Sequence, residues 1–163
     1  MKATRGIAVI VTAALALNAC SSRTPQFTAA DEAQVRSLFD STVARITRGD
    51  WTSWAGEFSD SAIFHPPNGK AIHGRAAILA FGQAFPPVEQ FNMWDVHVWG
   101  EGNLAYGTSA IAIKTKNAPA DTSKQVVVFR RAGADRWEVV AGSFNSDLPP
   151  APAPPASASK KPG

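Results

Sequence analysis

The second half of the chain consists of four long segments in which apolar and polar residues alternate, at 92–99, 104–116, 124–131 and 136–145. Short glycine-containing segments separate the members of each pair, at 100–103 and 132–135. This spacing is typical of β-hairpins with short turns. A longer polar connection over 117–123 joins the two hairpins. The pattern therefore predicts a meander of long antiparallel strands.

Three helical segments precede these strands. In the first, Thr28 and Asp31 have capping-box spacing, apolar residues recur with helical periodicity, and Gly49 ends the helix. Asp50 caps a short second helix with an aromatic stripe of Trp51, Trp54 and Phe58. The third opens at Gly74 and stops before Pro86. Helices followed by a strand meander predict an α+β fold, with the helices packed on one face of the sheet.

The N-terminus has the three regions of an export signal. Lys2 and Arg5 precede an apolar run from Ile7 to Leu17, and the only cysteine, Cys20, follows a small residue. The run is shorter than the roughly 20 residues that a membrane-spanning helix needs. The sequence therefore predicts a signal peptide over 1–19. A buried helix or an N-terminal anchor is the alternative.

Outside the domain core we expect two flanking segments. Residues 20–30 form a tether, and the Pro- and Ala-rich residues 149–163 form a disordered tail that cannot bury a core. The domain between them, 31–148, carries eleven Lys and Arg against thirteen Asp and Glu, so its net charge is −2 despite a whole-chain pI near 9.3. This balance argues against a nucleic-acid partner. A single cysteine also excludes internal disulfides and thiolate zinc sites.

Two family resemblances accompany these patterns. Residues 17–20, Leu-Asn-Ala-Cys, resemble a bacterial lipobox, which implies lipidation of Cys20 and a membrane partner. Ser21 then favours the periplasmic side of the outer membrane, with the inner membrane as the alternative. The domain resembles the nuclear-transport-factor-two-like superfamily, in its SnoaL-like and ketosteroid-isomerase-like branch. The residues that carry this resemblance are 48–50, 64–69, 74–78, 102–105, 136–140 and 145–147.

The second resemblance implies a particular architecture. It is a cone-shaped curved antiparallel sheet capped by three N-terminal helices, a cystatin-like α+β roll, around a pocket. A homodimer formed through the sheet is also implied. The steroid-isomerase branch needs a carboxylate base and a facing proton donor, but here Pro66 occupies the position of the base and Thr42 that of the phenol. We find no equivalent of the Asp-Arg-Asp group of the related epoxide hydrolases. The fold itself implies no single activity.

The first hairpin offers an independent candidate for acid–base chemistry. A four-residue turn at 100–103 would pair His97 with Tyr106 and Asp95 with Thr108, so these four side chains would share one face of the sheet. A carboxylate beside an imidazole and a phenol can transfer protons. A solvated polar stripe on the outer face is the alternative. The opposite face carries Trp94 and two valines against very small residues, which predicts a hollow.

The remaining candidates concern ligand binding. We expect His65 at the mouth of the pocket, either as a functional group or as a structural histidine. The expected ligand-contacting residues are Trp54, Phe58, Phe64, His65, Trp94, Asn145 and Asp147. The three histidines lack metal-ligand spacing, so we expect no metal site and no cofactor.

Three functions follow from these observations. The favoured one is an anchored periplasmic domain that binds a small apolar or amphipathic molecule in its cone. The second is a lyase or isomerase that uses His65, or Asp95 with His97 and Tyr106. The third is a dimeric interaction or assembly module.

Overall fold

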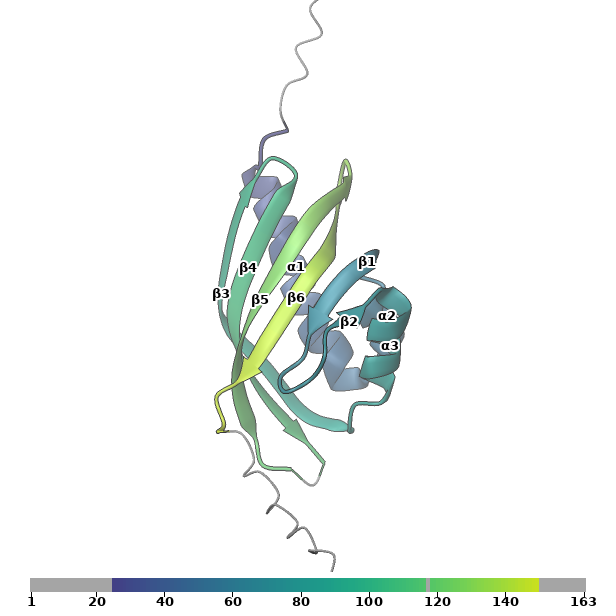
Figure 1. Cartoon of the computed structure of the whole chain (residues 1–163). Coiled ribbons are helices and arrows are strands. Elements are labelled where there is room, and N and C mark those ends of the chain that lie inside the picture. Colours follow the sequence, from purple (N-terminus) through teal and green to yellow (C-terminus); the bar gives the residue numbers. More distant parts are fainter. Residues whose placement is uncertain (1–24, 117, 150–163) are drawn as a thin grey trace, which may run out of the picture.

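The computed structural model describes residues 25–116 and 118–149. The predicted signal peptide, Cys20 and nearly all of the predicted tail lie outside these residues. The helices are α1 (Ala29–Arg48), α2 (Trp51–Ala55) and α3 (Arg75–Gln83), and the strands are β1 (Phe58–His65), β2 (Ile72–His73), β3 (Val88–Glu101), β4 (Leu104–Thr115), β5 (Asp121–Gly133) and β6 (Arg136–Ser146) (Figure 1). The predicted α+β fold is confirmed.

The strands form one curved, six-stranded sheet in the order β2-β1-β6-β5-β4-β3. The meander from β3 to β6 is antiparallel, as predicted. However, β1 pairs with β6 in parallel, so the sheet is not antiparallel throughout. A parallel pair needs a long connection that returns the chain to the same end of the sheet. Here α3 and the strands between β1 and β6 supply that connection.

Both hairpin turns are tighter than predicted. Glu101 pairs with Leu104, and Gly133 pairs with Arg136, so each turn has two residues instead of four. In the first turn, Gly102 has a φ of +58°, a left-handed conformation that glycine adopts without steric cost. The tighter turn shifts the pairing of β3 with β4 by two residues. Because side chains alternate between the two faces with a period of two, the residues near the turn still lie on the faces that the sequence predicted.

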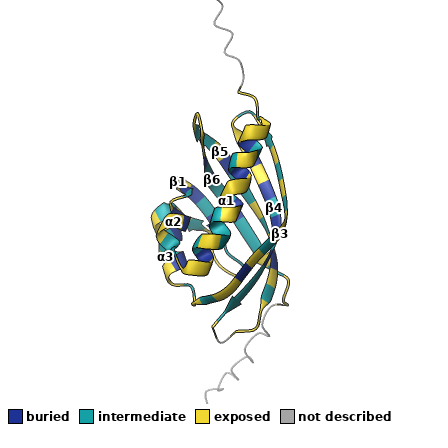
Figure 2. Ribbon diagram, turned by 180° about the vertical axis from the view of Figure 1, so that it is seen from behind, coloured by how far each residue is buried: buried dark blue, intermediate teal, exposed yellow. Residues whose placement is uncertain are grey.

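Helix α1 lies across one face of the sheet, which we call the inner face (Figures 1 and 2). Thr28 and Asp31 cap it reciprocally, and the left-handed Gly49 ends it. Val35, Phe39 and Ile46 are buried along one stripe of the helix. A Cβ at Gly107 of β4 would lie 2.5 Å from the ring of Phe39, so the absence of a side chain there allows close packing of α1 on the sheet.

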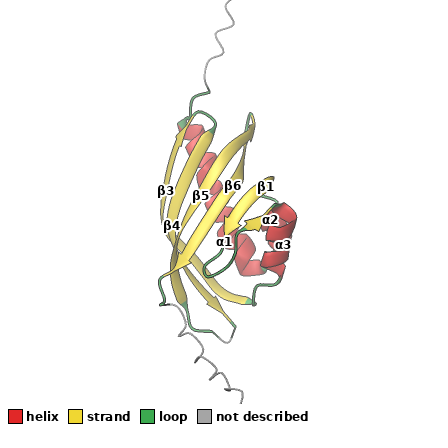
Figure 3. Cartoon of the chain, in the orientation of Figure 1, coloured by secondary structure: helices red, strands yellow, loops and turns green. Residues whose placement is uncertain are grey.

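The short helices α2 and α3 pack beside β1 and β2 at one end of α1 (Figure 3). Residue Phe58 begins β1 instead of continuing the second helix, because α2 ends at Ala55. Aromatic rings fill the space between these elements. Phe64 lies 5.6–5.9 Å, centroid to centroid, from Trp54, Phe58, Phe81 and Phe144. Aromatic side chains thus build much of the core at this end.

The boundary predicted at residue 31 is wrong, because the folded domain begins earlier. Phe27 packs edge-on against Trp137, with the ring centroids 5.6 Å apart, and Ala29 is already helical. Residues 25–30 are therefore part of the domain instead of the predicted tether. Among the helices of the described ranges, none has the length and apolar character needed to cross a bilayer.

Candidate functional site

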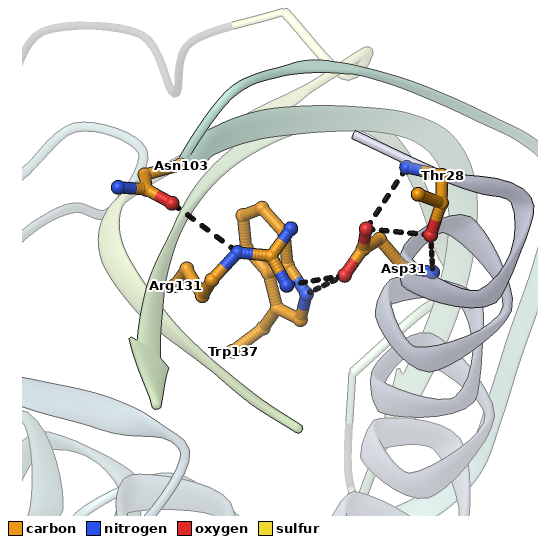
Figure 4. A network of polar contacts seen from close by, with 5 residues as sticks. All are labelled: Thr28, Asp31, Asn103, Arg131 and Trp137. Atoms are coloured by element: carbon orange, nitrogen blue, oxygen red, sulfur yellow. Dashed lines mark hydrogen bonds and ion pairs between the residues drawn. The ribbon is translucent and has the colours of Figure 1, made fainter. Parts of the chain in front are cut away.

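A charged network closes the end of the sheet at which α1 begins (Figure 4). Asp31 accepts hydrogen bonds from Arg131, from Trp137 Nε1 at 3.3 Å and from the Thr28 backbone at 2.9 Å. Both charged side chains are largely buried, with exposed fractions of 7% for Asp31 and 17% for Arg131. The Arg131 guanidinium holds the pKa of the Asp31 carboxyl well below its usual range. This network is structural, since it lines neither of the interior cavities.

Two adjoining cavities lie between the helices and the inner face. The first has a volume of about 50 Å³ and extends toward Phe39 of α1, and the second has about 70 Å³ and extends toward Phe81 of α3. Four residues line both cavities: Thr42, Trp54, Phe64 and Gln125. The expected hollow therefore exists in part only, because its own aromatic rings occupy most of the cone.

The first cavity has a polar group in a lining that is otherwise mostly apolar. The Glu57 side chain is only 7% exposed and forms an ion pair with Arg45 of α1. Thr42 Oγ1 donates to the other carboxylate oxygen of Glu57 at 3.1 Å. Gln125 also lines this cavity, and its Nε2 donates to Ser109 Oγ at 2.8 Å. The buried carboxylate is balanced by its partners, as a charge at such a site must be.

Several of the expected ligand-contacting residues lie at these cavities. Trp54 and Phe64 line both, and Phe58 lines the first. His65, in contrast, is exposed at the end of β1 and lines neither. Because side chains alternate along a strand, the buried position of Phe64 directs His65 away from the core.

The placement of Trp94 inside the cone is wrong. A β-bulge interrupts the pairing of β3 with β4 between Trp94 and His97, and Asp95 there has a φ of +55°. One extra residue in a strand reverses the alternation of faces beyond it. Val96 and Val98 accordingly pack against the core, whereas Trp94 is 47% exposed on the opposite, outer face.

The predicted acid–base set also lies on the outer face. His97 Nε2 is 2.8 Å from Asp95 Oδ1, and both side chains are about 70% exposed, at 72% and 68%. The register differs from the prediction: His97 pairs with Thr108, and Tyr106 pairs with Trp99. None of these residues reaches the interior cavities. The alternative of a polar stripe on the outer face describes them correctly.

Asn145 and Asp147 likewise lie outside the cone. Asn145 is exposed opposite Lys124, whose side chain forms an ion pair with Asp147. That contact lowers the pKa of the Asp147 carboxyl. Asn145 instead lines an open hollow of about 390 Å³ on the outer face, together with Asp95, Thr108 and Lys124.

Sequence reasoning missed the polar residues that do line the cone. Glu57 is the one acidic residue between Trp54 and Phe58, and an isolated charge in an aromatic segment is a usable signal. Gln125 lies in alternation with Ser123 and Val127 on the inner face of β5. Its position depends on the register of the sheet, which local pattern alone does not determine. In the described ranges, no three His, Cys, Asp or Glu side chains gather as a metal site would require.

Comparison with known proteins identifies the family. The SnoaL-like domain family matches residues 35–145, which span more than half of the chain. The protein belongs to the SnoaL-like domain family. No curated protein sequence matches this SnoaL-like protein.

Solved structures share the fold of this SnoaL-like domain. A nuclear-transport-factor-two-like protein with a cystatin-like fold from Novosphingobium aromaticivorans has a TM-score of 0.63 and 16% identity, covering 71% of this chain and 81% of that one. A domain of unknown function with a cystatin-like fold from Nostoc punctiforme has a TM-score of 0.64 and 22% identity, with coverages of 75% and 80%. A ketosteroid isomerase-like protein from Erwinia carotovora has a TM-score of 0.61 and 13% identity, with coverages of 72% and 96%. At these identities, the likeness is one of fold.

Proposed function

We propose that this SnoaL-like protein binds a small apolar or amphipathic molecule in its cone. The observation that carries the proposal is the pair of adjoining cavities with a mainly apolar lining, rich in aromatic rings, and a few polar groups, which is the usual composition of a ligand site. Together the cavities approach the roughly 150 Å³ of an apolar cavity that takes up benzene. The ligand is therefore a molecule with about one ring or a short chain.

Filling the first cavity tests this proposal. Val127 lines that cavity from the inner face of β5, whereas its neighbour Val126 is exposed on the outer face. We expect Val127→Phe to abolish the binding of single-ring compounds, because the added ring takes the space of the ligand. Val126→Phe is the matched control and keeps binding. Titration of a panel of single-ring compounds, followed by calorimetry, measures both. If no compound of the panel binds the unaltered protein, the proposal is contradicted.

We further propose that a lipid on Cys20 holds the domain at the periplasmic side of the outer membrane. The support is the cationic and apolar run that ends at Cys20, and several acyl chains give stable anchoring because each buried methylene contributes about 0.8 kcal/mol. We expect Cys20→Ser to abolish incorporation of a labelled fatty acid and to release the protein from the membrane fraction. Ser21→Asp should keep the label but shift the protein toward the inner membrane. Incorporation of the labelled fatty acid into the Cys20→Ser variant would contradict the proposed lipidation of Cys20.

The outer face favours a homodimer in addition. Trp94, Trp99, Leu104, Tyr106 and Val126 are each 42–54% exposed there, and the rings of Trp99 and Tyr106 lie 5.7 Å apart, centroid to centroid. Exposed apolar patches mark interaction sites. In a two-fold symmetric dimer, each substitution occurs twice at the interface, so its effect on association is doubled. We expect Trp99→Arg to give a monomer by light scattering, whereas Leu148→Arg, at an exposed apolar residue beyond β6, leaves the dimer intact. A monomeric unaltered protein would contradict this part of the proposal.

A further inference from the structure

Building on the proposed function, we infer that the cone selects ligands that carry a hydrogen-bond donor, such as a phenol or a short alcohol, and that Glu57 accepts this hydrogen bond. The inference depends on which hydrogen-bonding groups of the cavity lining are already used within the protein. A group whose capacity is used internally offers nothing to a ligand. The spare capacity that remains defines the chemistry of the molecule that fits.

The hydroxyl and amide donors of the cavity lining, which are the donors that could compete for Glu57, are used internally. Thr42 donates its hydroxyl proton to Glu57, and Gln125 Nε2 donates to Ser109 Oγ and to the Met93 sulfur. Arg45 donates to Glu57 from outside the lining of either cavity. Ser143 lines the first cavity, but it pairs with the outward-facing Val126, so its hydroxyl points to the outer face.

Acceptors, in contrast, retain free capacity. An ionised carboxylate has about four acceptor positions, and Glu57 uses one for Arg45 and one for Thr42. The hydroxyl oxygen of Thr42 also keeps its lone pairs. A ligand with a hydrogen-bond donor can donate to these unused acceptor positions. A ketone or a carboxylate has only acceptors there, and the negative charge of Glu57 would repel a carboxylate.

The second cavity accounts for the rest of the ligand. Apart from Thr42 and Gln125, its lining is aromatic and aliphatic, with Trp51, Phe85 and Ile111 among its residues. An apolar ring or chain in this cavity would direct a hydroxyl group past Thr42 toward Glu57. The site therefore fits a small amphipathic molecule with its donor at one end.

Titration of the purified full chain with phenol, toluene and benzoate tests the inference, because the three share one ring and differ in the attached group. We expect phenol to bind about tenfold or more tightly than toluene, because its hydroxyl group donates a hydrogen bond to a charged carboxylate. Benzoate should not bind. Glu57→Gln, whose amide hydrogens face the cavity once its oxygen accepts from Arg45, should reduce the phenol preference to near one.

Glu138→Gln is the matched control, because Glu138 is also a shielded carboxylate, with 12% exposure, but pairs with Arg130 on the outer face. It should leave the phenol preference unchanged. Equal affinities of phenol and toluene for the unaltered protein would overturn this inference and leave the proposed function standing. Tighter binding of benzoate than of phenol would have the same two consequences. Absence of binding by all three compounds overturns both. If Glu57→Gln does not fold, the comparison of the three compounds with the unaltered protein still decides.

Discussion

Replacing Asp31 with alanine is expected to lower the free energy of unfolding by about 3 kcal/mol, at the lower end of the range for a broken buried ion pair. The loss arises because Arg131, only 17% exposed, is left without its carboxylate, and because the cap of α1 is removed. The guanidinium keeps its hydrogen bond to Asn103 and its contact with the Trp137 ring, which limits the cost. Urea denaturation measures the change.

The neighbouring residue provides the control. Glu32 forms an exposed pair with Arg36 one helical turn away, and such pairs contribute about 0.3–0.5 kcal/mol. Glu32→Ala should therefore have a small effect. Combining Asp31→Ala with Arg131→Met should recover part of the loss, because no unpaired charge then remains in the interior. Equal effects of Asp31→Ala and Glu32→Ala would show that the pair is not a buried one.

The same pair predicts the behaviour in acid. Hydrogen bonding to Arg131 holds the pKa of Asp31 below its value in the unfolded chain, which is about 3.9. The native state then binds fewer protons than the unfolded state in this range, so stability falls as pH falls. The stabilisation by the pair is complete above pH of about 4 and is lost as pH drops toward the native pKa. The stability difference between the unaltered protein and Asp31→Ala should narrow in acid and stay constant from about pH 5 to 7.

Phe64→Ala is the second substitution with a large expected effect. Phe64 is 8% exposed, lines both cavities and contacts four other aromatic rings. Removing its ring should cost about 3–5 kcal/mol, the typical loss for a buried phenylalanine. It should also enlarge the space that the two adjoining cavities share. We therefore expect the variant to bind a two-ring compound such as indole, which the unaltered protein excludes.

The melting temperature of the variant with and without indole measures this effect. A ligand that binds only the native state stabilises that state by mass action. At a ligand concentration of a hundred times Kd, the stabilisation is about 2.7 kcal/mol. Phe27→Ala is the control. Phe27 packs against Trp137 and lines neither cavity, so its removal destabilises the domain without rescue by indole. Equal rescue of both variants would mean that the Phe64 ring does not limit the size of the ligand that the cavities accept.

Local pattern was sufficient for the elements themselves. The helix capped by Thr28 and ended by Gly49, and the long strands on either side of two glycine-containing turns, follow from short-range periodicity and turn chemistry. The same information identified Trp54, Phe58 and Phe64 as aromatic residues of the interior. It did not reveal that these rings would fill most of the cone, because the space inside the cone depends on the distance between α1 and the sheet. That distance is short because the Phe39 ring packs directly on the backbone of Gly107 in β4.

The faces of the sheet were decided by tertiary structure. One bulge at Asp95 moved Trp94 to the outer face, and no local signal in the alternating residues 92–99 marks that extra residue. Pairing of β5 with its neighbours likewise brought Gln125 into the lining of the same cavity as Glu57. The sequence by itself determined which segments are helices and strands, since that depends on neighbours along the chain. The lining of the cavities depends on register and packing between distant segments, and only the folded structure defines these.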